Sequence, residues 1–164
     1  MQDEVDRLVA AWRRERPDLD VTPMEVLSRV GRLSRHLDRA RRQAFAEQGL
    51  EAWEFDVLTA LRRAGDPYQL SPGRLLRETL VTSGTMTNRV DRLAARGLVR
   101  RLPDPHDRRG VIVELTAEGR AQVDAALNAL LEHERSLLAG LGERDQRRLA
   151  TLLRVLVTPF DQGP

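Results

Sequence analysis

The chain has 164 residues, a formal net charge of +2 and no cysteine. This length fits one domain with a core of its own, and the missing thiols exclude disulfide frameworks, cysteine nucleophiles and thiolate metal sites. The first twenty residues show no signal-peptide pattern, and no later stretch approaches the ~18 apolar residues that a membrane span needs. We therefore expect a cytoplasmic protein that has no membrane partner.

The positive charge is concentrated in one part of the chain. All 27 basic residues are arginines. Residues 69–112 carry nine of them against four acidic residues, an excess of +5, whereas the remainder carries 18 against 21, a balance of −3. A local positive patch is typical of a surface that binds nucleic acid, and arginine suits both guanine edges and narrow minor grooves.

Apolar residues at helical spacing predict three helices in the first part of the chain. We expect them over residues 3–16, 22–49 and 51–64. The second helix begins with a capping-box pattern, Thr22-Pro23-Met24-Glu25, and is longer than a small core requires. The turn signal Gly65-Asp66-Pro67 ends the third helix.

Two short helices, a hairpin and two further helices follow. The pattern predicts helices over residues 71–80 and 83–96, strands over 98–102 and 111–115, and helices over 116–138 and 143–157. The second short helix directs Met86, Val90 and Leu93 inward. The hairpin has a long charged tip, and Thr116 is expected to cap the helix that follows it.

Two short helices joined by a tight turn and followed by a hairpin give the order of a winged helix-turn-helix, a fold that binds duplex DNA. The outward face of the second helix carries hydroxyl and amide groups that can bind base edges, and arginines at a wing tip suit a minor groove. Asp104 is expected to hold one wing arginine by ion pairing. The alternatives are a solvated hairpin tip and a helix-turn-helix that binds no DNA. The candidate DNA contacts are Ser71, Thr82, Ser83, Thr85, Met86, Thr87, Asn88, Arg92, Arg108 and Arg109.

Motifs for catalysis and for metal binding are missing from the sequence. His36, His106 and His133 are scattered over a helix, a hairpin tip and another helix. The sequence from His133 begins an H-E-x-x pattern, but Leu137 replaces the second histidine of a zinc protease. The chain also lacks a phosphate-binding loop, a dinucleotide fingerprint and a nucleophile elbow. We expect no enzyme, no cofactor and no metal site.

The stretch from Leu70 to Gly119 resembles the MarR (multiple antibiotic resistance regulator) family, most specifically in the wing sequence DPHDRRG and the following LTAEG. The resemblance extends from about residue 22 to the end of the chain. It implies a mainly α fold with a small β-hairpin wing, in which residues 1–48 and 116–164 supply dimerisation helices and residues 51–115 form the winged helix-turn-helix of a single domain. It also implies a homodimer, a pseudo-palindromic promoter site and release of DNA when a small molecule binds.

Four positions are similar to the urate-responsive branch of that family: Trp12 on the extra N-terminal helix, Asp56, Arg63 and Arg89. The resemblance implies that they form a ligand pocket for urate and related purines or for aconitate-type tricarboxylates. Asp56 and Arg63 are seven residues apart and share a helix face, where an anion can pair with the arginine. The alternatives are a core role for Trp12, a structural Asp56–Arg63 ion pair and a phosphate contact by Arg89. A regulator of the same fold that senses no ligand, or that activates transcription, also remains open.

Overall fold

The computed structural model describes residues 2–79, 81–105 and 107–161, without the side chains of Arg108 and Arg109. It confirms the mainly helical fold with a small antiparallel sheet. In chain order the elements are α1 (Glu4–Glu15), α2 (Thr22–Glu47), α3 (Ala52–Arg63), β1 (Gln69–Leu70), α4 (Pro72–Thr79), α5 (Ser83–Ala95), β2 (Val99–Asp104), β3 (Asp107–Leu115), α6 (Ala117–Leu138) and α7 (Glu143–Asp161).

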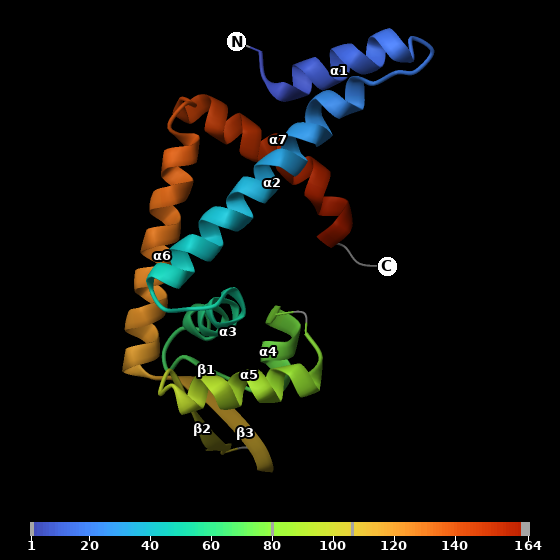
Figure 1. The fold of residues 1–164 in the computed structure, drawn as a ribbon. Coiled ribbons are helices and arrows are strands. Elements are labelled where there is room, and N and C mark those ends of the chain that lie inside the picture. The colour runs from blue at the N-terminus through green and yellow to red at the C-terminus, as the bar shows by residue number, and fades with distance from the viewer. Residues whose placement is uncertain (1, 80, 106, 162–164) are drawn as a thin grey trace.

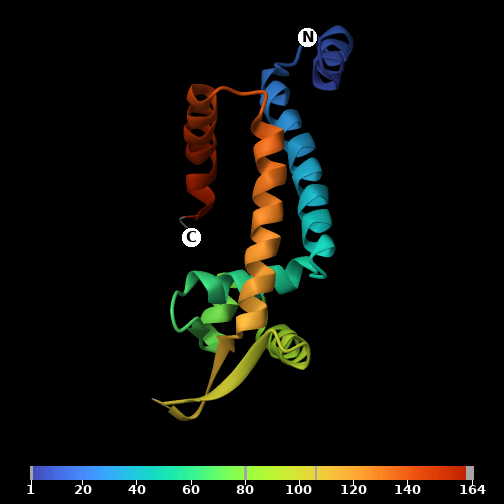
Figure 2. The same ribbon diagram turned by 90° about the vertical axis from the view of Figure 1, so that its left-hand side faces the viewer.

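The elements divide into a lobe and a set of long helices (Figures 1 and 2). The lobe contains α3, α4, α5 and the sheet. The helices α2 and α6 pack against each other and lead away from the lobe; α1 lies at their far end, and α7 begins there and turns back towards the lobe. The order of α4, α5, β2 and β3 is the predicted winged helix-turn-helix, with α5 as its second helix.

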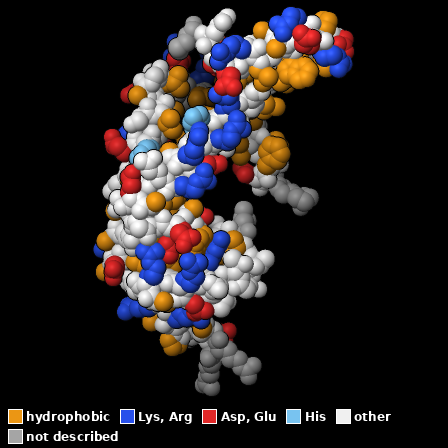
Figure 3. Space-filling view, in the orientation of Figure 1, with side chains coloured by type: hydrophobic (Ala, Val, Ile, Leu, Met, Phe, Trp, Pro, Cys, Tyr) orange, Lys and Arg blue, Asp and Glu red, His pale blue; other side chains and the backbone are white. Residues whose placement is uncertain are grey.

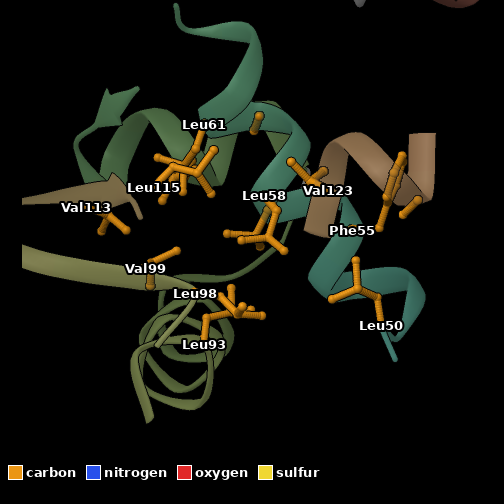
Figure 4. Close-up of a cluster of buried hydrophobic side chains, with 14 of the residues drawn as sticks. Leu50, Phe55, Leu58, Leu61, Leu93, Leu98, Val99, Val113, Leu115 and Val123 are labelled. Atoms are coloured by element: carbon orange, nitrogen blue, oxygen red, sulfur yellow. The ribbon is translucent and has the colours of Figure 1, made fainter. Parts of the chain in front are cut away.

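One hydrophobic core holds the lobe together and includes the ends of α2 and α6 that reach it. Leu58 of α3 lies at the centre of this cluster, between Leu61 and Leu98 (Figure 4). Phe45 of α2 stacks on Phe55 of α3 with ring centroids 4.0 Å apart. Because burying one such side chain contributes about 1.5–3 kcal/mol, these contacts fix α3 against both long helices.

The sheet has the strand order β1-β3-β2, and all its strands are antiparallel. The β2–β3 ladder runs from the Val99–Leu115 pair to the Asp104–Asp107 pair. The expected long tip over residues 103–110 is therefore wrong, because β2 continues to Asp104 and β3 begins at Asp107. The sequence does not predict strand β1. Its two residues pair with Glu114 and Val113 of β3 and form the third strand of the sheet.

The start of α6 follows the sequence prediction. The Thr116 hydroxyl accepts a hydrogen bond from the Gly119 amide at 3.0 Å and lies within hydrogen-bond distance of the Leu98 carbonyl. Gly119 packs so closely on Leu98 that a Cβ at this position would lie 2.0 Å from the same carbonyl oxygen. The backbone of α6 is therefore in direct contact with the backbone at Leu98, immediately before β2.

The helix α2 begins at Thr22 as predicted, but its cap differs from the prediction. The capping position is occupied by Val21, whose side chain makes no capping bond, and Thr22 is already the first residue of the helix. Instead the Thr22 amide donates to Asp20 at 3.0 Å, and Glu25 accepts from Arg13 of α1 at 2.6 Å. The predicted capping box is wrong because a nearby aspartate and a tertiary ion pair satisfy these groups.

The helix α1 is held on α2 by ion pairs and a small apolar cluster. Arg29 of α2 bonds to Asp3 at 2.8 Å and to Asp6 at 2.6 Å. The bond from Arg29 lowers the pKa of Asp3 to about 2. Beneath these charges Val5 and Val9 pack against Val21.

The exposed apolar side chains of the described residues lie almost entirely outside the lobe. The helix α7 buries none of its residues. No large exposed hydrophobic residue lies between positions 34 and 130 of the described chain, whereas α1, α2, α6, α7 and their connections carry many. These residues are Leu8, Trp12, Leu19, Val26, Leu27, Val30, Leu33, Leu131, Leu137, Leu138, Leu141, Leu152, Val155, Leu156, Val157 and Phe160. None of the described helices is long and apolar enough to cross a membrane.

Candidate DNA interface and ligand cavity

The helix α5 has one apolar face and one polar face. Its residues Met86, Val90 and Leu93 are buried in the lobe core, as the spacing predicts. Met86 is only 1% exposed, so its prediction as a DNA contact is wrong. A side chain at this position on the helix packs inward with Val90 and Leu93, and it positions the opposite face instead of touching DNA.

The polar face of α5 carries most of the other predicted DNA contacts. These exposed residues are Thr82, Ser83, Thr85, Thr87, Asn88 and Arg92. The hydroxyls of Thr82 and Thr85 lie 2.9 Å apart, and the Thr87 hydroxyl donates to the Ser83 carbonyl at 3.2 Å. Ser71, which is half-buried before α4, accepts a weak bond from the Arg74 amide at 3.4 Å. Short hydroxyls and an amide on an open helix face have the size and chemistry that a major groove admits.

The wing lies beside this helix and is tied to it at its base. Arg101 of β2 pairs with Asp91 of α5 at 2.7 Å and reaches the Thr87 carbonyl at 3.4 Å. Arg108 and Arg109 belong to β3, but their side chains lie outside the described residues. Which of them Asp104 holds therefore stays a prediction.

A cavity of about 250 Å³ opens where α2, α3 and α4 meet. Asp56 and Arg63 both line it, so the structure brings these two predicted ligand residues together. Arg63 pairs with Glu78 of α4 at 3.1 Å. Thr59 also lines the cavity, and its buried hydroxyl has no hydrogen-bond partner in the described structure. The remaining lining residues are Arg41, Phe55 and Thr79.

The other two predicted ligand residues lie elsewhere in a single chain. Trp12 is on α1, at the far end of α2 from the cavity (Figures 1 and 2). The Arg89 guanidinium lies over the Trp53 ring, 5.5 Å from its centroid, on the side of α5. The four residues therefore do not form one pocket within a single chain, and ligand contacts by Trp12 and Arg89 stay a prediction.

The sequence does not predict the contacts between α3 and α5. Glu54 of α3 is only 2% exposed and accepts from Arg96 at 2.5 Å, and Arg96 also donates to the Gly49 carbonyl at 2.8 Å. One turn away, Glu51 accepts from Arg92 at 3.1 Å. These partners are 41 and 42 residues apart in the chain, and no local pattern connects them. Among the described residues, no group of three or more histidine, aspartate or glutamate side chains is placed to hold a metal ion.

Known proteins with similar sequences bind DNA as regulators. Residues 48–110 match the sequence model of the MarR family. The chain is 41% identical over 150 residues to the transcriptional regulator PecS of Dickeya dadantii, a match that covers 92% of this chain and 90% of PecS.

Solved structures show the same fold with and without DNA. A mutant MarR of Escherichia coli bound to operator DNA has a TM-score of 0.67 and 27% identity, covering 85% of this chain and 99% of that one. BpsR of Bordetella bronchiseptica, whose DNA binding is regulated by 6-hydroxynicotinic acid, has a TM-score of 0.59 and 31% identity, covering 78% and 98%. These relatives are regulators rather than enzymes, as predicted. The chain belongs to the MarR family of winged helix-turn-helix proteins and is a DNA-binding transcriptional regulator.

Proposed function

We propose that two copies of the chain form a repressor that reads a pseudo-palindromic promoter site and leaves it when a small anion binds. The observation that carries this proposal is the position of the cavity. Its walls come from α2, which leads to the far helices, from α3, which contacts α5, and from α4, the first helix of the helix-turn-helix. A ligand at this junction acts on the placement of the DNA-reading helix relative to the rest of the subunit.

The exposed apolar helices support the dimer. In a single chain α7 contains no buried residue, and it exposes Leu152, Val155, Leu156 and Phe160 to solvent. Apolar surface on this scale marks an interface between proteins. A two-fold dimer presents two α5 helices, and two equivalent helices read two half-sites of a palindrome.

The two arginines that line the cavity offer hydrogen-bond donors to an anionic effector. Arg41 and Arg63 face Asp56 and Glu78, so the four groups sum to zero formal charge. An added carboxylate or urate anion competes with Glu78 for Arg63, and it can accept a bond from the unpartnered Thr59 hydroxyl. Loss of the Arg63–Glu78 pair removes one polar contact between α3 and α4, which also share the hydrophobic core. Purines of the urate type and tricarboxylates of the aconitate and citrate type are the effector classes we propose, and BpsR shows that an aromatic carboxylate can act on this fold.

The test is a fluorescence-anisotropy titration of the full chain against the duplex upstream of its own gene and against a scrambled duplex, at one salt concentration. It is repeated with urate, xanthine, citrate, trans-aconitate and 6-hydroxynicotinate. We expect tight binding to the specific duplex alone, weakened by one ligand class. The Thr59→Val variant removes the hydroxyl at nearly constant volume, so it should bind the duplex normally and respond less to the ligand.

Each alternative gives a different result in this titration. Specific binding that no ligand weakens contradicts the effector proposal and favours a regulator that senses nothing. Binding that a ligand strengthens indicates an activator or a corepressor site. Absence of specific binding contradicts the operator assignment. A molecular mass of one chain by light scattering contradicts the dimer.

A further inference from the structure

Trp53 lies in the first turn of α3, half-buried, with its ring against two arginines of α5. The Arg92 guanidinium lies 4.8 Å from the ring centroid and the Arg89 guanidinium 5.5 Å from it. Both distances are within the reach of a cation–π contact. One aromatic ring therefore holds two neighbouring arginines of the helix whose polar face carries the candidate DNA contacts.

Glu51 completes this arrangement from the residue that precedes α3. One of its carboxylate oxygens accepts from the Trp53 indole at 2.8 Å and the other from Arg92 at 3.1 Å. Glu51 also forms the capping box of α3 with Glu54, so its backbone position is fixed. Basic and acidic side chains interleave over this part of the lobe in Figure 3. The two arginines are thus attached to the end of a rigid helix.

This arrangement is poorly explained as a device for stability. The Glu51 and Arg92 side chains are 61% and 57% exposed, and exposed ion pairs contribute little to folding. Its clear effect is on conformation. A free arginine side chain samples many rotamers, and an arginine fixed before binding loses less entropy when it meets a base edge or a phosphate.

We propose that Trp53, with Glu51, is a positioning residue that sets DNA specificity by holding Arg89 and Arg92 in one orientation. This inference rests on the proposed use of α5 to read DNA. A guanidinium fixed in one place bonds well to one base sequence and poorly to others, because bidentate bonds to base edges depend on geometry. A mobile guanidinium can bond to the backbone phosphates of DNA of any sequence. Loss of Trp53 therefore weakens discrimination more than it weakens general binding.

The experiment compares Trp53→Leu with wild type by anisotropy, using the specific and the scrambled duplex at several salt concentrations. We expect the ratio of the two Kd values to fall roughly five- to thirtyfold, the effect of losing two cation–π contacts, with little change in binding to the scrambled duplex. Trp53→Phe keeps an aromatic face and should restore most of the discrimination. Thermal unfolding of each variant checks that the lobe remains folded.

Tyr68 offers a matched control in the same lobe. Its ring also holds two arginines, Arg62 at 5.1 Å and Arg120 at 5.5 Å, and it also packs against the main core. Tyr68→Leu therefore removes the same kind of contact away from α5, and we expect it to leave the ratio of the Kd values unchanged. An equal loss of discrimination in both variants would mean that general destabilisation causes it, and the proposal would be wrong.

Arg92→Leu separates the inference from the proposed function. If neither Arg89→Leu nor Arg92→Leu weakens specific binding, these arginines do not read DNA and the positioning role falls with that assignment. If Arg92→Leu weakens specific binding and Trp53→Leu does not, then α5 reads DNA without needing the Trp53 ring to hold its arginines. That result refutes only the positioning role of Trp53. A loss of discrimination in both variants, with rescue by Trp53→Phe, supports the proposal.

Discussion

The substitution Gly119→Ala tests the joint between the wing and α6. A Cβ at this position would lie 2.0 Å from the Leu98 carbonyl oxygen, whereas real Cβ atoms essentially never come within 3.0 Å of another heavy atom. The backbone of α6 or of β2 must therefore move by at least about 1 Å (3.0 minus 2.0). Leu98 is held in place by the Thr116 amide and hydroxyl, so it cannot turn aside as a flexible side chain can.

Two effects oppose each other in this variant. Alanine favours a helix over glycine by about 1 kcal/mol. Overpacking costs about 1–3 kcal/mol and occasionally more, and contact with backbone lies at the upper end because no rotamer change relieves it. The overpacking term exceeds the helix gain, and we expect a net loss of about 1–2 kcal/mol. For a chain of this size that loss lowers Tm by roughly 2–8 °C.

The assay is thermal unfolding followed by circular dichroism, at one protein concentration because Tm of an oligomer depends on concentration. Gly84→Ala is the matched control: Gly84 also lies in the first turn of a helix, α5, and a Cβ there meets no atom within 4 Å. It should raise Tm slightly or leave it unchanged. A Gly119→Ala variant as stable as Gly84→Ala would refute the close approach to Leu98.

Three further predictions concern other parts of the chain. The lowered pKa of Asp3, about 2 against an ordinary 3.8, means that its bond to Arg29 stabilises α1 above pH 4 and weakens as pH falls through 2. The difference in amide exchange of α1 between wild type and Asp3→Asn should therefore shrink as pH falls from 4 to 2, and a difference as large at pH 2 as at pH 4 contradicts it. Thr116→Ala removes the cap of α6 and should reduce the free energy of unfolding by about 0.5–2 kcal/mol in a urea titration, with no loss counting against the cap. Val155→Asp, on the exposed face of α7, should halve the mass measured by light scattering, and an unchanged mass would exclude α7 from the dimer interface.

The sequence is sufficient to predict those parts of the fold that local patterns determine. Helix spacing and the Thr116 cap predict α3, α5 and α6 within a residue or two, because each buries a regular stripe. The two-residue strand β1 is too short to show a pattern, and it forms only because β3 offers a free edge. The capping box at Thr22 fails because Asp20 and Arg13 supply other partners from outside the motif.

The candidate site was predictable to a similar extent. The polar face of α5 and the shared helix face of Asp56 and Arg63 follow from spacing along single helices. The structure leaves the polar residues of α5 exposed and places Asp56 and Arg63 in the wall of one cavity. Met86 was assigned to DNA against its own spacing with Val90 and Leu93, which places it inside. Trp53 was missed because its significance comes from Arg89 and Arg92, more than thirty residues later in the chain.

The close backbone contact between Gly119 and Leu98 means that α6 and the wing move together as one rigid unit. The 22 residues of α6 span about 33 Å at 1.5 Å per residue, from the wing to the region of exposed apolar helices. Because the helix is fixed to β2 at one end, a tilt of about 5° at the other end moves the lobe by roughly 3 Å, close to the 3.4 Å rise of one base pair. In the proposed dimer, small changes in how the two subunits meet would thus be converted into a mismatch with the spacing of DNA half-sites. The mutations that alter operator choice should therefore include residues far from any base, along the length of this helix.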